Sequence, residues 1–122
     1  MIMVKLFESE LKIMRELWEN GDMTAAQIAN ILKVKTKWNR NTTYTVIKKC
    51  VEKGVVERIE PHFLCHALAT KEQVQEYATN ELIAQLYDGS KDMLLSALLG
   101  RGSLTAEQRE KWKKIIDEDE SM

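Results

Sequence analysis

The chain has 122 residues and a formal net charge of −1, made from 18 Lys and Arg against 19 Asp and Glu. This length suits one compact domain, or a small domain with an appendage, and 44% hydrophobic residues with a single Pro exclude a disordered or collagen-like chain. No apolar stretch approaches the roughly 20 residues of a membrane span, and residues 1–5 do not open a secretory signal. We therefore expect a cytoplasmic protein without membrane insertion.

The N-terminal third of the chain carries the signals of two helices. Apolar residues over 7–18 recur at the spacing of one helix face and predict a helix that ends near residue 20. Thr24 is followed three residues later by Gln27, the spacing of a capping box. This pair predicts a second, short helix that runs to about Lys33 and is followed by a basic connection over 34–38.

A third helix and a hairpin follow. The third helix is predicted over 40–53, with Asn39 as its cap and Gly54 as its stop. After Gly54 the pattern becomes extended, and two β-rich runs over 55–59 and 63–68 flank a turn, which predicts a β-hairpin. Three helices followed by a hairpin is the order of a winged helix-turn-helix domain.

Residues 70–122 predict three more helices, each of which begins at a capping signal. The capping residues are Thr70 with Gln73, Ser90, and Thr105 with Gln108. The predicted fold is therefore mainly α with a small β-hairpin: a winged-helix DNA-binding domain over 1–69 and a helical dimerisation domain over 70–122.

The C-terminal helices carry apolar stripes that about fifty residues cannot easily enclose alone. A symmetric dimer would cover these side chains, and packing back on the winged domain is the alternative. The residues that we assign to the dimer interface are Tyr77, Leu86, Leu94, Leu95, Leu98, Trp112, Ile115 and Ile116.

Charge is distributed unevenly along the chain. Residues 1–69 have a net charge of +3 and residues 70–122 a net charge of −4, while residues 33–53 alone reach +6. Such asymmetry favours contact with nucleic acid, although a solvated lysine-rich face is the alternative. The basic segment coincides with the predicted third helix, which favours the nucleic-acid interpretation.

The third helix has the composition of a helix that reads the DNA major groove. Its apolar residues share one face, and short polar and basic side chains share the other. Early residues of such a helix contact bases, which makes Asn41, Thr42, Tyr44 and Thr45 the base-reading candidates. The candidates for phosphate contacts are Lys37, Arg40, Lys48, Lys49 and His62.

Several sequence pieces occur in a characteristic order over nearly the whole chain. They are Glu10 to Trp18, Trp38, Thr42, Thr45, Lys48, Lys49, Lys53, Gly54, and Leu86 to Gly89. With these pieces the chain resembles the penicillinase-repressor (BlaI/MecI) family of winged-helix repressors. The resemblance implies a homodimer whose winged domains bind an inverted-repeat operator in double-stranded DNA and whose C-terminal helices form the dimer interface.

The resemblance also implies control of β-lactamase or other β-lactam-response genes in antibiotic resistance. Induction would follow proteolytic cleavage of the repressor, after a membrane sensor protease of the β-lactam receptor type detects the drug. The cleaved bond would fall at Ala97 and Leu98, where the family has Asn-Phe. Tyr44 stands where family members commonly carry a basic residue, so the operator bases are expected to differ.

Other functions receive less support from the sequence. His62, Cys65 and His66 lie close together, but strand alternation places Cys65 on the opposite face, so we predict no metal site and no cofactor. Copper-responsive relatives carry a cysteine-rich tail, which the end of this chain lacks. The sequence contains no glycine-rich phosphate loop and no nucleophile paired with a base, so it does not indicate an enzyme. The alternative to a repressor is a protein-interaction adaptor that uses the winged-helix scaffold without binding DNA.

Overall fold

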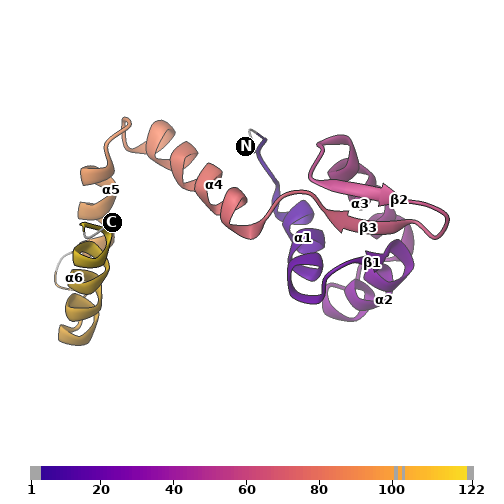
Figure 1. Cartoon of the computed structure of the whole chain (residues 1–122), viewed down its shortest axis with the longest axis horizontal. Coiled ribbons are helices and arrows are strands. Elements are labelled where there is room, and N and C mark those ends of the chain that lie inside the picture. Colours follow the sequence, from indigo (N-terminus) through magenta and orange to yellow (C-terminus); the bar gives the residue numbers. More distant parts are fainter. Residues whose placement is uncertain (1–3, 101, 103, 121–122) are drawn as a thin grey trace. The chain divides into compact units, whose positions relative to one another are not determined.

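The computed structural model describes residues 4–100, 102 and 104–120. Figure 1 shows its elements in chain order: α1 (Glu8–Asn20), β1 (Met23–Thr24), α2 (Ala25–Lys35), α3 (Arg40–Glu52), β2 (Val56–Ile59), β3 (Leu64–Ala67), α4 (Lys71–Leu86), α5 (Lys91–Leu99) and α6 (Ala106–Glu120). The chain forms two compact units, Met1–Thr79 and Asn80–Met122, with the boundary inside α4. The segment 1–5, which we expect not to open a secretory signal, includes residues 1–3, and these lie outside the described residues. Residues 121–122 at the end of the chain also lie outside them.

The first unit is a winged-helix domain, as predicted. The three helices α1 to α3 are followed by the antiparallel hairpin of β2 and β3, whose connecting turn extends beyond the sheet (Figure 1). The short strand β1 was not predicted. It pairs with β3 through Met23 opposite Cys65 and Thr24 opposite Leu64, and the sheet order is β1-β3-β2.

The predicted capping signals begin the helices as expected. Thr24 Oγ1 accepts from the backbone N–H of Gln27 at 3.1 Å, and Gln27 Oε1 accepts from that of Thr24 at 2.9 Å. The same reciprocal pairs form at Thr70 with Gln73 and at Thr105 with Gln108, while Asn39 caps α3 and Ser90 caps α5. Each cap satisfies backbone donors that the first helical turn leaves free.

One helix end was predicted wrongly. Helix α2 continues to Lys35 rather than stopping near Lys33, so Val34 belongs to the helix and not to the connection. Val34 is 82% exposed and contributes nothing to the core. The connection to α3 is correspondingly short, and Lys37 within it has a φ of 62°.

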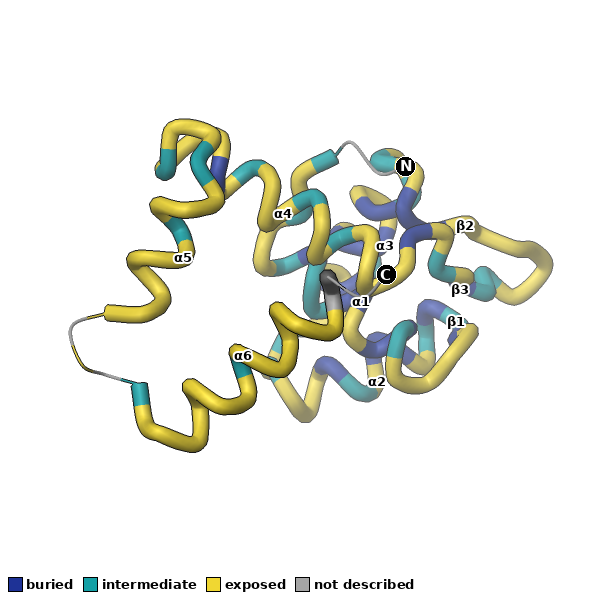
Figure 2. Tube along the Cα trace, turned by 60° about the vertical axis from the view of Figure 1, so that its left-hand side comes forward, coloured by how far each residue is buried: buried dark blue, intermediate teal, exposed yellow. Residues whose placement is uncertain are grey.

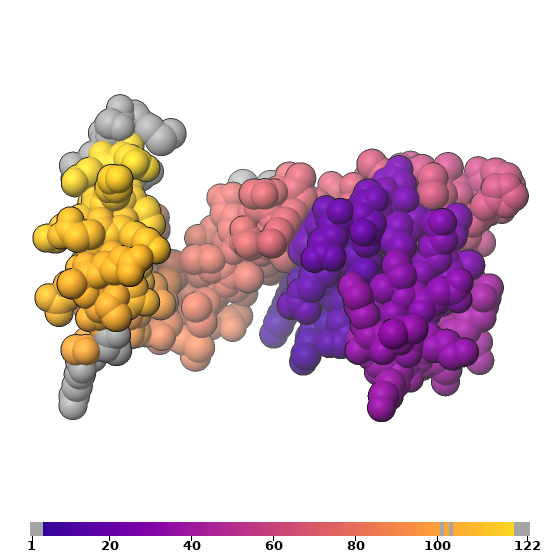
Figure 3. Space-filling model, turned by 90° about the horizontal axis from the view of Figure 1, so that it is seen from below, coloured from indigo at the N-terminus to yellow at the C-terminus, as the bar shows by residue number. Residues whose placement is uncertain are grey.

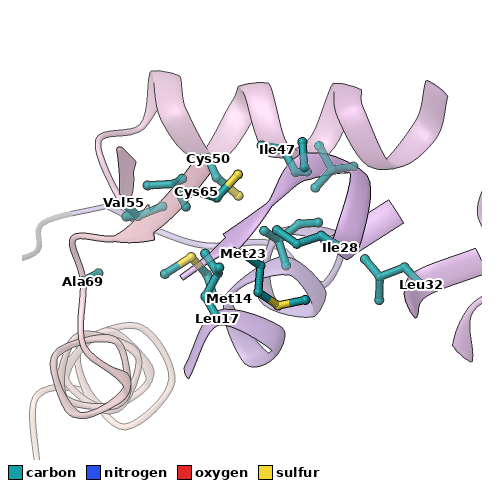
Figure 4. Close-up of a cluster of buried hydrophobic side chains, with 14 residues drawn as sticks. Met14, Leu17, Met23, Ile28, Leu32, Ile47, Cys50, Val55, Cys65 and Ala69 are labelled. Carbon is teal, nitrogen blue, oxygen red and sulfur yellow. The ribbon is translucent and has the colours of Figure 1, made fainter. Parts of the chain in front are cut away.

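The core of the winged unit lies between the three helices and the sheet. Met14, Ile28 and Ile47, one from each helix, are fully buried, and Cys65 completes the core from β3 (Figure 4). At the edge of the core, the indole Nε1 of Trp18 donates to the carbonyl of Ala69 at 2.9 Å. This bond ties α1 to the chain just before α4. The space-filling view shows the unit as one continuous body (Figure 3).

The second unit has much less buried surface. Along α5 and the described side chains of α6 no residue is buried, in contrast to the dark blue core of the winged unit (Figure 2). The single buried residue that α4 contributes is Ile83. None of the helices within the described residues is long and apolar enough to span a membrane.

Candidate nucleic-acid interface

Helix α3 presents two chemically different faces. Thr43, Val46, Ile47 and Cys50 are buried against the rest of the unit, which anchors the helix along one side. The opposite side exposes five polar or basic side chains: Asn41, Thr42, Thr45, Lys48 and Lys49. The two faces predicted for this helix are therefore confirmed, with one side buried and the polar stripe at the surface.

The side chains of the exposed stripe form no hydrogen bond or ion pair within the described residues. Asn39 accepts the backbone N–H of Thr42 at 2.8 Å, but the side chains of Asn41, Thr42 and Thr45 form no hydrogen bond there. Lys48 and Lys49 form no ion pair with any described residue. Amide, hydroxyl and ammonium groups in this state can donate to base edges and phosphates without first breaking an internal bond.

Two other candidates on α3 bind each other. The guanidinium of Arg40 lies 4.9 Å from the centre of the Tyr44 ring, and its Nη2 donates to the Tyr44 hydroxyl at 2.9 Å. Tyr44 is half-buried, and its ring edge meets Phe63 at a centroid distance of 5.8 Å. Arg40 and Tyr44 therefore form a unit that lies against the wing, the hairpin of β2 and β3 with its connecting turn.

The wing contributes Arg58 and Phe63, which are not among the site residues predicted from the sequence. Arg58 lies over the Phe63 ring, with its guanidinium carbon 3.7 Å from the ring centre, and also pairs with Glu60. His62, predicted as a phosphate contact, is exposed in the turn between the two strands. The strand pattern gave no signal for Arg58, because it shares a face with the buried Val56 and residues 57–59 are nevertheless all exposed.

Two of the basic side chains in residues 33–53 are paired with carboxylates inside the winged unit. Lys35 donates to the buried carboxylate of Glu16 at 2.9 Å, and this hydrogen bond raises the pKa of Lys35. Lys53 is paired with Glu10, which is 1% exposed. The basic residues of 33–53 that remain without an acidic partner among the described residues are Lys33, Lys37, Arg40, Lys48 and Lys49. Of these, Lys33 lies on α2, Lys37 in the connection between the helices, and Arg40, Lys48 and Lys49 on α3.

The histidines and cysteines do not converge. His66 Nδ1 lies 2.7 Å from Oδ1 of Asp22, Cys65 is buried, and His62 is in the turn. No group of three or more His, Cys, Asp or Glu side chains within the described ranges has the arrangement of a metal site. The hydrogen bond with Asp22 raises the pKa of His66.

The residues that we assigned to a dimer interface are divided between exposed and half-buried positions. Tyr77, Leu94 and Trp112 are half-buried. The exposed members are Leu86 (71%), Leu95 (41%), Leu98 (56%), Ile115 (64%) and Ile116 (51%). Ala97 and Leu98, the predicted cleavage position, lie in the last turn of α5 and are both exposed.

Comparison with known proteins assigns the chain to a family. Residues 6–118 match the family described as penicillinase repressor. A relative in Latilactobacillus sakei, described as an uncharacterised 16.5 kDa protein in the ptsI 3′ region, is 28% identical over 99 residues, which cover 80% of this chain and 68% of the relative. The match extends through both compact units, and the winged unit has the exposed helix face that such a repressor requires. The chain therefore belongs to the penicillinase repressor family, whose members are DNA-binding transcriptional repressors and not enzymes.

Proposed function

We propose that the protein is a dimeric repressor that binds an inverted-repeat operator and blocks transcription of β-lactamase or other β-lactam-response genes. The observation that carries this proposal is the exposed face of α3. It offers Asn41, Thr42 and Thr45 for base contacts, and Lys48 and Lys49 for phosphates, with no internal partner among the described residues. A repressor acts in the compartment that holds its DNA, so the proposal includes a cytoplasmic location.

The apolar surface of the second unit supports the dimer. A groove of about 400 Å³ between α5 and α6 is lined by Leu95, Leu99, Trp112 and Ile116 among others. Contiguous apolar surface of this kind marks interaction sites on soluble proteins. A symmetric partner would bury it, and two winged units related by a two-fold axis would match the two halves of a palindrome.

Induction would act on the same second unit. Ala97 and Leu98 are exposed but helical, while proteases act on chain segments that open locally. We propose that a membrane sensor protease cleaves at this position after the last turn of α5 unwinds. Gly100, with a φ of 61°, ends the helix three residues after Ala97, and helix ends open more easily than helix centres, which supports this proposal.

The deciding experiment is binding to the promoter DNA upstream of the protein's own gene. The wild type is expected to form a sequence-specific complex of two chains per site, and its affinity should fall steeply with salt. The double variant Lys48→Glu and Lys49→Glu should abolish the complex. Lys71→Glu and Lys91→Glu, at exposed positions outside α3 and outside the α5–α6 groove, change the net charge equally and should preserve it. A wild type without a sequence-specific complex would contradict the proposal and favour the protein-interaction adaptor.

A further inference from the structure

Phe63 connects the wing to both helices of the helix-turn-helix. Its backbone carbonyl accepts the N–H of Ala25, the first residue of α2, at 3.0 Å. Its ring meets the edge of Tyr44 on α3 at an interplanar angle of 87° and lies under Arg58 of β2. Three elements that are separate in the sequence therefore meet at one residue of the wing.

The side chains around Phe63 form a stack with a cation at each end. Arg58 lies 3.7 Å from the Phe63 ring centre, Phe63 meets Tyr44 at 5.8 Å, and the Arg40 guanidinium lies 4.9 Å from the Tyr44 ring centre. Both contacts with arginine are of cation–π type, and the aromatic pair has the edge-to-face geometry that such rings prefer. The stack spans from the outer strand of the wing to the first turn of α3.

The backbone of Phe63 indicates that its position is imposed by these contacts. Its φ is 51°, in the left-handed region that residues other than Gly seldom occupy. A bulky residue keeps such a conformation when the surrounding structure determines it. Here the Ala25 hydrogen bond holds the backbone, and the half-buried ring packs against the core.

We propose that Phe63 is a positioning residue which fixes the wing relative to α3, so that Arg58 binds a backbone phosphate of the operator while α3 occupies the groove. This inference rests on the proposed function. Arg58 is able to change partners, because its pair with Glu60 is exposed on both sides and contributes little stability. A phosphate replaces the Glu60 carboxylate, and the Phe63 ring keeps the guanidinium in place. Specificity then depends on the wing and α3 binding as one rigid unit.

The test compares four full-length single variants and one double variant with the wild type on a fluorescent operator duplex over a series of salt concentrations. Phe63→Leu removes the ring but keeps an apolar side chain, and Phe63→Tyr keeps the ring. Phe7→Leu is the matched control, since Phe7 is 57% exposed and its ring faces Lys5 and Lys53 rather than the wing. A fourth protein, Arg58→Gln, removes the proposed phosphate contact itself.

Phe63→Leu and Arg58→Gln should each weaken binding about threefold to tenfold. Each should also make the negative slope of log K against log salt shallower by about 0.9, the value for one phosphate. The double variant should be no weaker than either single variant, because the ring acts through Arg58. Phe63→Tyr and Phe7→Leu should match the wild type. Independent effects of the two changes, or a wild-type slope in Phe63→Leu, would overturn the inference.

Amide hydrogen exchange of the free protein separates this inference from the proposed function. Phe63→Leu should speed exchange in β2 and β3 without changing it in α1, whether or not DNA binds. If the wild type binds no operator, the proposed function fails. The positioning role is then tested separately by exchange, and it fails if exchange in the wing of Phe63→Leu equals that of the wild type. If the wild type binds and exchange in the wing is unchanged, only the positioning role fails.

Discussion

The Nζ of Lys53 lies 2.6 Å from Oε1 of Glu10, and the Glu10 side chain is only 2% exposed. The same carboxylate oxygen accepts the backbone N–H of Phe7 at 2.7 Å, while the ammonium also donates to the carbonyl of Lys5. One buried ion pair thus joins the residue that follows α3 to the start of α1. The anchored end of α3 is the end away from the base-reading candidates.

Removal of one partner of this pair should destabilise the winged unit. Glu10→Ala leaves the Lys53 ammonium and the Phe7 N–H without their acceptor, and breaking such a pair costs about 2 to 4 kcal/mol of unfolding free energy. Urea unfolding followed by circular dichroism measures the loss. Glu8→Ala is the control, because its pair with Lys12 is 3.6 Å long and Glu8 is exposed. A loss of similar size in both variants would show that the buried pair has no special role.

The pair of His66 and Asp22 should make stability depend on pH. Their hydrogen bond raises the pKa of His66, so the protonated imidazolium is favoured in the folded state. The resulting stability is fully present below the ordinary histidine pKa of about 6.5 and is lost as pH rises through the raised value. The difference in urea midpoint between wild type and Asp22→Asn should therefore shrink between about pH 6 and pH 8. Gln75→Ala, an exposed change that involves no titratable group, should leave the pH profile of the wild type unchanged.

The two cysteines should be unreactive while the protein is folded. Burial raises the pKa of Cys50 to about 12 and that of Cys65 to about 11, so almost no thiolate forms near neutral pH. Treatment with iodoacetamide at about pH 8 should label neither residue within the time that labels both in urea. Mass spectrometry gives the count of labels. Rapid labelling of Cys65 alone in the native protein would indicate that β3 opens independently of the helices.

Local signals in the sequence predicted most of the helical framework. The bonds between Thr24 and Gln27 form within three residues of sequence, so a single chain segment contains all the information they need. The same holds for the Asn39 cap and for the period that buries Val46 and Ile47. These local features are enough to predict the winged-helix fold class.

Contacts between distant segments could not be predicted in this way. Strand β1 has two residues and exists because Met23 pairs with Cys65, 42 positions later. Phe7 fits the apolar period of α1, yet it is the N-cap and is 57% exposed: Glu10 accepts its backbone N–H, and the helix begins one residue later. The contact of Tyr44 with Phe63 likewise depends on how the wing folds back, which the helix pattern does not encode.

Base contacts and phosphate contacts on α3 should be separable by their effect on operator sequence. Asn41→Ala and Thr45→Ala remove polar groups proposed to read base edges, so each should relax preference at one or two base pairs by about 1 to 3 kcal/mol. Lys48→Gln should weaken binding to all sequences alike and reduce the salt slope by about 0.9. Selection from a randomised operator library measures both effects. A uniform loss for Asn41→Ala would reassign that residue to the backbone.

The exposed apolar residues of the second unit should determine the oligomeric state. Leu98 is 56% exposed on α5 and Ile116 is 51% exposed on α6, and in a symmetric dimer both side chains would be buried. A glutamate at either position would place a charge in that interface, so Leu98→Glu and Ile116→Glu should shift a micromolar dimer to monomer in light scattering. Leu68→Glu, at a site 52% exposed in the winged unit, is the matched control and should remain dimeric.

Both interface variants should also bind a single half-site as well as the wild type does while losing the advantage of the full palindrome, because the reading helices are intact and only their linkage is lost. A wild type that is monomeric at this concentration, or two glutamate variants that stay dimeric, would place the apolar face outside the dimer interface.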